Sequence, residues 1–176
     1  MSMRRSVLIL SLFLIFILQG TALPWIIPDA WQTRIIPDLV LVILLFVTIY
    51  HHRHTALVLG LSFGMIHDIV FYGRILGAHS FAMGLSVYLI GLIFQIPRAP
   101  LPLMMTVVLL GNLLENSMLF GIQSVFNLNQ QPYNWALLNY MLPTMLFHFA
   151  VALILYIPLR RQLALLKKEE RKEETT

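Results

Sequence analysis

Two carboxylates, Asp68 and Glu115, lie deep inside long apolar stretches of this 176-residue sequence. On insertion scales, an ionisable side chain near the centre of a spanning helix costs about 2.5 to 3.5 kcal/mol. A carboxylate kept at such a position can accept hydrogen bonds, anchor a ligand or exchange a proton. These two residues are therefore the first candidates for a functional site, and the elements around them must offset the cost of burying them.

The two carboxylates are predicted to lie at the same depth. Asp68 is 14 residues after His54, and Glu115 is 15 residues after Pro100. At 1.5 Å per residue, each carboxylate lies about 21 to 22 Å along a helix that starts on the cytoplasmic side. Both are therefore expected in the outer half of a membrane.

Three further ionisable residues are predicted near that level, which indicates a polar cluster open to the outer side: His67, Arg74 and His79. His148 belongs to a span that runs in the opposite direction. We therefore expect His148 in the inner half, outside this cluster.

Three interpretations of the cluster stay open. In the first, Asp68 and Glu115 accept hydrogen bonds from neighbouring helices or from Arg74, or stay protonated, and hold a helix bundle together. In the second, they line a cavity or a partner groove and make specific contacts there. The third is catalytic, but the sequence has no H-E-x-x-H spacing, nucleophile elbow or phosphate loop.

A histidine-rich turn offers the other possible metal ligands: His51, His52 and His54. We expect this turn to be solvated at a helix end rather than metal-bound. The sequence therefore predicts no metal site, no cofactor and no enzymatic activity.

The composition predicts an integral membrane protein. Hydrophobic residues make up 59% of the chain, charged residues 11%, and the mean hydropathy is +0.80, which is unusual for a soluble domain. The net charge is +4, but the basic residues gather at span ends and in the tail, so nucleic acid is not an expected partner. The absence of cysteine excludes disulfides and thiolate sites.

The apolar stretches predict an all-α fold with six transmembrane helices, since a spanning helix needs about 20 apolar residues. The second is short for a span. The expected spans are Ser6 to Ile27, Pro37 to Tyr50, Thr55 to Tyr72, Ile75 to Ile96, Pro100 to Phe126, and Trp135 to Leu159.

Basic residues set the predicted orientation. With both termini in the cytoplasm, ten Lys and Arg residues lie inside and two lie outside, namely Arg34 and Arg74, as the positive-inside rule requires. Residues 1–166 are expected to form the transmembrane domain, and residues 167–176 a charged cytoplasmic tail. A cleaved signal peptide is the alternative for the first segment, but its apolar character continues to Ile27, beyond a usual signal core.

Small residues predict close helix contacts. Gly60, Gly64 and Asp68 recur every four residues and therefore share one face of the third span. On the fourth span Gly77, Gly84 and Gly91 recur every seven residues and form a second smooth seam. We expect both faces to meet protein rather than lipid.

Three short stretches, in this order, resemble the MreD family of bacterial rod shape-determining membrane proteins. They are Ile36-Pro37-Asp38-Leu39-Val40-Leu41, the G-x-x-x-G-x-x-x-D face from Gly60 to Asp68, and Leu76-Gly77-Ala78-His79-Ser80. The resemblance runs from about Pro37 to Arg98, and in length and span count it covers the whole chain.

The resemblance implies a non-enzymatic component of the cell-elongation machinery in the bacterial cytoplasmic (inner) membrane. MreD-like proteins act with MreC, a single-span protein, and indirectly with MreB, RodA and a penicillin-binding transpeptidase. The implied fold is similar to that of the S components of energy-coupling-factor transporters, with an outward-facing cavity. Pro37, Asp38, Gly77 and His79 belong to the matching stretches, so we include them among the candidate site residues.

Two hypotheses follow from this. In the first, the glycine faces and Asp68 dock the single span of an MreC-like partner, and the protein supports lateral peptidoglycan synthesis and the regulation of cell shape. In the second, the protein is a transporter S component whose polar cluster binds a vitamin-like ligand between aromatic walls, for which Phe71, Tyr72 and Trp135 are available.

Overall fold

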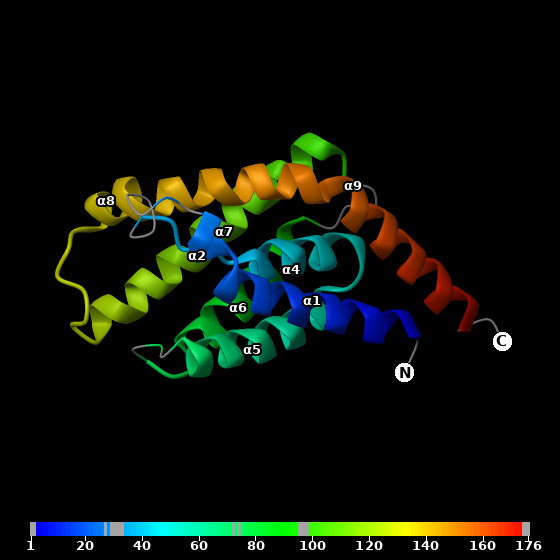
Figure 1. The fold of residues 1–176 in the computed structure, drawn as a ribbon, viewed down its shortest axis with the longest axis horizontal. Helices are drawn as coiled ribbons and strands as arrows, with labels where there is room; N and C mark the ends of the chain where they lie inside the picture. The colour runs from blue at the N-terminus through cyan, green and yellow to red at the C-terminus, as the bar shows by residue number, and fades with distance from the viewer. Residues whose placement is uncertain are drawn as a thin grey trace.

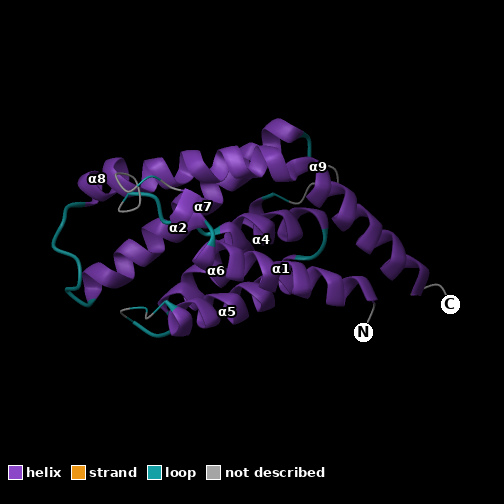
Figure 2. Ribbon diagram, viewed as in Figure 1, coloured by secondary structure: helices purple, strands orange, loops and turns teal. Residues whose placement is uncertain are grey.

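The regular structure is entirely helical wherever the computed structural model describes the chain, at residues 3–26, 28, 34–71, 73, 75–94 and 99–173. The all-α prediction is confirmed for these residues (Figures 1 and 2). The elements are α1 (Met3–Thr21), α2 (Leu23–Ile26), α4 (Leu39–Tyr50), α5 (Arg53–Val70), α6 (Ala78–Ile93), α7 (Leu101–Val125), α8 (Tyr133–Ala136), the π-helical turn η1 (Leu137–Met141) and α9 (Leu142–Glu173).

The six long helices correspond to the six apolar stretches, and their ends differ from the predicted ends by a few residues in most cases. By length and apolar character, two helical segments are long enough to cross a membrane, Leu101–Val125 and Tyr133–Leu163. Ser6–Thr21, Leu39–Tyr50 and Ala78–Ile93 are shorter apolar helices. The last helix continues to Glu173, so most of the predicted charged tail is a helical extension.

Helix α4 forms the centre of the fold. It contacts α1, α5, α6, α7 and α9, and its residues from Val40 to Tyr50 are all buried. With 12 residues it is about 18 Å long, shorter than a bilayer core of about 30 Å. A helix that is apolar on every side needs to be surrounded by protein. The shortness of this segment therefore reflects its place inside the bundle.

The contact between α5 and α6 is the most extensive helix contact in the fold, and small residues make it possible. A Cβ added at Gly60 would lie 3.0 Å from the Cα of Gly84, and one added at Gly64 would lie 2.5 Å from the Cα of Ser80. The Ser80 hydroxyl donates a 2.7 Å hydrogen bond to the carbonyl of Leu61. The two predicted glycine seams are therefore in contact with each other.

The chain enters α9 through α8 and the π-helical turn. Pro143 follows this turn, and a proline ring inside a helix clashes with the carbonyl four residues earlier. A wider turn relieves that clash, and π turns are frequent at functional sites. Tyr140, within the π turn, lines the cavity described next.

Candidate functional site

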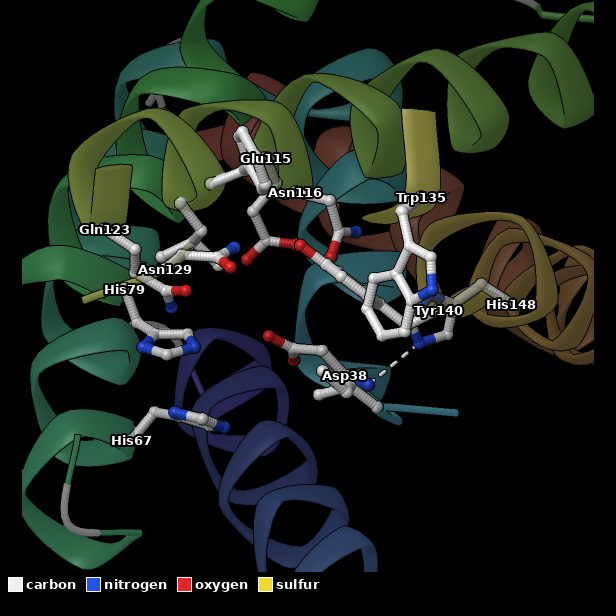
Figure 3. A pocket seen from close by; sticks show the side chains of 13 residues that line it. Asp38, His67, His79, Glu115, Asn116, Gln123, Asn129, Trp135, Tyr140 and His148 are labelled. Atoms are coloured by element: carbon white, nitrogen blue, oxygen red, sulfur yellow. Dashed lines mark hydrogen bonds between the residues drawn. The ribbon is translucent and has the colours of Figure 1, made fainter. Parts of the chain in front are cut away.

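A cavity of about 440 Å³ lies among α4, α5, α6, α7 and α9 (Figure 3). Its wall contains acidic, imidazole, amide and aromatic side chains. The lining residues are Ile36, Asp38, His67, His79, Glu115, Asn116, Leu119, Phe120, Gln123, Asn129, Trp135, Tyr140 and His148.

The first wall is the buried start of α4. The N–H groups in the first turn of a helix have no partner within the helix, so burying this end requires acceptors from elsewhere. Asp38 is the N-cap residue, and its Oδ1 accepts a 3.1 Å hydrogen bond from the N–H of Leu41. The N–H of Leu39 donates to Oε1 of Gln19 on α1, at 2.9 Å.

Helix α9 supplies two further acceptors. The N–H of Asp38 donates to Nε2 of His148 at 2.8 Å (Figure 3), and the N–H of Ile36 donates to Oγ1 of Thr144 at 3.1 Å. The Nδ1 of His148 forms a hydrogen bond with Oδ1 of Asn112 on α7. Because Nε2 accepts, the proton is on Nδ1, and His148 joins three helices as a neutral ring.

This arrangement corrects the prediction for His148. Counting residues along straight spans placed His148 in the inner half, apart from the polar cluster, whereas it lines the same cavity as His67, His79 and Glu115. The reason is the short α4, which begins deep in the bundle and brings Asp38 to the level of His148.

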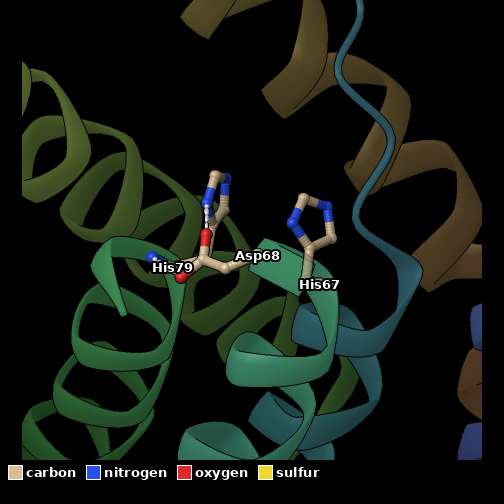
Figure 4. A group of neighbouring side chains, drawn as sticks. All are labelled: His67, Asp68 and His79. Carbon is tan, nitrogen blue, oxygen red and sulfur yellow. Dashed lines mark hydrogen bonds and ion pairs between the residues drawn. The ribbon is translucent and has the colours of Figure 1, made fainter. Parts of the chain in front are cut away.

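The second wall is the turn between α5 and α6, where Asp68 accepts hydrogen bonds from α6. Its Oδ2 accepts from the N–H of Gly77 at 2.8 Å and from the N–H of His79 at 3.1 Å. Its Oδ1 accepts a 2.7 Å hydrogen bond from Nδ1 of His79 (Figure 4). A carboxylate at a helix N-terminus is favoured by the free N–H groups and the helix dipole. Asp68 lies behind His79 and is not part of the cavity lining.

Gly77 makes this capping geometry possible. Its φ of +90° is in the left-handed region, which glycine adopts without steric strain. The chain therefore turns into α6 with the N–H groups of Gly77 and His79 directed at the carboxylate.

The third wall is α7, which contributes Glu115. Its side chain is 3% exposed, and Oε1 has no hydrogen-bond partner among the described residues. A buried polar atom without a partner costs roughly 1 to 3 kcal/mol, and more when it is charged. In Figure 3 the carboxylates of Glu115 and Asp38 point into the space that His67 and His79 also face.

The structure thus brings four of the candidate site residues to the cavity or directly behind it: Asp38, Asp68, His79 and Glu115. Gly60 and Gly64 lie in the α5–α6 contact, and Pro37 precedes the N-cap of α4. Arg74 and Tyr72 lie outside the described residues. Of the other proposed aromatic walls, Trp135 lines the cavity, whereas Phe71 packs on Phe16 and Gly20.

The histidine-rich turn was predicted to be solvated, and this prediction is wrong for one of its three histidines. His52 and His54 are exposed, but His51 is buried, with 7% exposure, as the C-cap residue of α4. Its ring centroid lies 4.8 Å from that of His52.

Several lining residues were not candidates from the sequence, namely Asn116, Gln123, Asn129, Tyr140 and His148. The amides on α7 and in the following loop carried a weak signal, because Asn112, Asn116 and Gln123 interrupt an apolar stretch. Tyr140 had no distinguishing pattern. Chemically, this lining offers hydrogen-bond acceptors, imidazole nitrogens and two carboxylates to a polar or cationic ligand.

Together, the apolar helices and the polar cavity among them are typical of a small, all-helical membrane protein. The sequence model of the family described as rod shape-determining protein MreD matches residues 2–166, and the chain belongs to this family. The match covers nearly the whole chain, beyond the stretch from Pro37 to Arg98 that carries the resemblance. Membership in the family gives the protein a role in rod-shape determination.

A curated relative agrees with the family match. The chain is 29% identical over 137 residues to the rod shape-determining protein MreD of Bacillus subtilis (strain 168), covering 78% of this chain and 79% of the relative. No solved structure matches the chain.

Proposed function

We propose that the protein is a non-enzymatic, multi-pass component of the machinery that elongates rod-shaped bacterial cells. The family match over residues 2–166 carries this proposal. In the proposed topology the chain passes through the cytoplasmic membrane six times, with the short α4 enclosed by the other helices, and both termini are cytoplasmic, as the ten-to-two distribution of basic residues favours. The cavity then opens toward the outer side.

The proposed partner is an MreC-like protein with a single span. Through it, the protein would act with MreB, RodA and a penicillin-binding transpeptidase and support lateral peptidoglycan synthesis. A single-span partner requires a helix-sized contact with this chain, and small residues allow two helices in a membrane to approach closely.

The glycine face of α5 is unsuitable for that contact, because α6 already covers Gly60 and Gly64. A partner helix at this seam would have to displace α6, so we move the proposed contact away from it. On α7, Gly121 is exposed, and a Cβ added there would meet nothing within 4 Å. This part of α7 has room for another helix, and we propose it as the contact for the partner's span.

The test of the function is depletion of the protein in its own host, with cell width and new wall synthesis measured together. We expect rods to become wider and rounder, and a fluorescent wall-precursor label to leave the lateral wall. Re-expression of the unmodified chain should restore both. Unchanged width and unchanged lateral labelling in depleted cells would overturn the proposal.

The alternative, a vitamin-binding S component of a transporter, is not supported by the comparisons. The family match and the curated relative both concern rod shape. We therefore do not develop a transport function further.

A further inference from the structure

Two imidazole rings from different helices face each other in the cavity. His67 is in the last turn of α5, and His79 is in the first turn of α6, with ring centroids 4.3 Å apart. One ligand atom from each ring and one carboxylate oxygen of Asp68 all lie within 4.8 Å of one another (Figure 4). Such a group has the donor types that bind borderline metal ions.

The hydrogen bonds leave the histidines with nitrogens for a ligand. The Nδ1 of His67 is buried and has no hydrogen-bond partner among the described residues. The Nδ1 of His79 is bonded to Asp68, so Nε2 is the nitrogen of His79 that remains. Histidines that bind metals usually donate their second N–H to a carboxylate, which fixes the ring and makes it a better ligand. Asp68 is placed to do this for His79.

The acidic side chains in the lining of the cavity suit a cation. Glu115 and Asp38 line the side across from the two histidines (Figure 3). The Glu115 carboxylate is almost fully buried, and its Oε1 is unpartnered within the described part of the chain. The described lining contains neither Lys nor Arg. A cation in the cavity would therefore be balanced by the carboxylates across from the rings.

We propose that this cavity binds one divalent transition-metal ion of the zinc type. His67 and His79 supply two nitrogens, Asp68 orients His79 from behind, and the carboxylates of Asp38 and Glu115 lie across the cavity and balance the charge of the ion. Zinc accepts this mixture of ligands, whereas calcium and magnesium prefer oxygen ligands alone.

Small side-chain movements complete the site. With bonds of about 2.0 to 2.1 Å in a tetrahedral arrangement, the two nitrogens need to be roughly 3.3 Å apart. Rotation of His67, whose Nδ1 has no competing hydrogen bond among the described residues, would bring its nitrogen to this distance from Nε2 of His79. No metal-binding motif is visible in the sequence here, because His67 and His79 are 12 residues apart and meet only through the turn that Asp68 and Gly77 shape. The metal site and the rod-shape role do not depend on each other.

The test is a zinc titration of the purified full-length chain in detergent, after chelator treatment, against a competing fluorescent zinc indicator. We expect one zinc ion per chain. His67→Ala and His79→Ala should each weaken zinc binding at least tenfold. Asp68→Asn should weaken it about 10- to 100-fold, the usual effect of removing a residue that orients a ligand.

The histidine-rich turn provides the matched controls. His52→Ala and His54→Ala remove exposed imidazoles and should leave the affinity unchanged. Cobalt substitution of the unmodified chain gives a second readout that needs no variant, because a site with two nitrogen ligands should produce visible absorption bands that zinc removes. Gel filtration confirms that each variant is folded.

Three results would overturn the proposal. They are the absence of zinc binding and of cobalt bands in the unmodified chain, full affinity in the folded His67→Ala variant, and loss of binding in His52→Ala or His54→Ala. Depletion phenotypes do not enter this test, so its failure would leave the rod-shape proposal standing.

Discussion

Asp68 on α5 accepts hydrogen bonds from both the backbone N–H and the ring Nδ1 of His79 on α6, at 3.1 Å and 2.7 Å. One carboxylate thereby caps a helix that is not its own and fixes the orientation of a ring that faces the cavity. The packing of the α5–α6 pair and the geometry of the site therefore depend on the same side chain.

Replacing Asp68 should separate these two roles. Asp68→Leu removes every acceptor and leaves the N–H groups of Gly77 and His79 without this partner, which costs roughly 1 to 3 kcal/mol for each buried group. Asp68→Asn keeps one oxygen as an acceptor. We expect a larger loss of thermal stability in detergent for Asp68→Leu than for Asp68→Asn. Equal melting temperatures for the unmodified chain and Asp68→Leu would contradict the capping role.

Replacing glycine by alanine should affect stability differently at two positions, one in the α5–α6 contact and one on the open surface of α7. Gly64→Ala places a Cβ 2.5 Å from the Cα of Ser80, so the helices must separate and stability should fall by about 1 to 3 kcal/mol, as for overpacked cores. Gly121→Ala meets nothing within 4 Å and should be neutral, or stabilising by up to about 1 kcal/mol through helix propensity. Thermal unfolding of both variants measures this difference, and a Gly64→Ala variant as stable as Gly121→Ala would refute the packing argument.

His148 should be important for stability as well as for the cavity. His148→Leu leaves the N–H of Asp38 and the side-chain oxygen of Asn112 without their partner, so we expect a loss of about 2 kcal/mol or more. His54→Leu, at an exposed position, is the control and should change stability little. Similar melting temperatures for the two variants would show that the buried hydrogen bonds of His148 contribute nothing.

The proposed topology can be tested without first removing native thiols, because the chain has no cysteine. Gln130→Cys and His52→Cys each place one thiol at an exposed position. A membrane-impermeant maleimide should label Gln130→Cys in intact cells and His52→Cys only after permeabilisation. The reverse labelling pattern would place both termini outside the cell and would make the cavity open toward the cytoplasm.

Much of the helical fold could be predicted because long runs of apolar residues indicate helices. The sequence also indicated that Gly60 and Gly64 meet protein, since small residues one turn apart make a flat face. It could not indicate which helix fills that face. Gly84 and Ser80 on α6 fill it, a pairing that depends on how the two helices cross.

The candidate site could be predicted only in part, because some of its residues are brought together by the packing of the helices. Asp68 and Glu115 stood out because carboxylates are rare in apolar stretches, whereas the role of His148 depended on the depth at which α4 begins. Residue counting assumes that every helix starts at the same level. Helix α4 does not, because side chains from α1 and α9 satisfy its first N–H groups inside the protein.

The most direct test of the proposed scaffold role is detergent co-purification of the tagged chain with the MreC-like protein encoded in the same genome, sized by gel filtration. We expect a stoichiometric complex for the unmodified chain, and loss of that complex in a folded Gly121→Leu variant, which fills the open face of α7. A monodisperse chain that elutes without the partner would contradict the scaffold role. A complex that survives Gly121→Leu would contradict the contact proposed on α7.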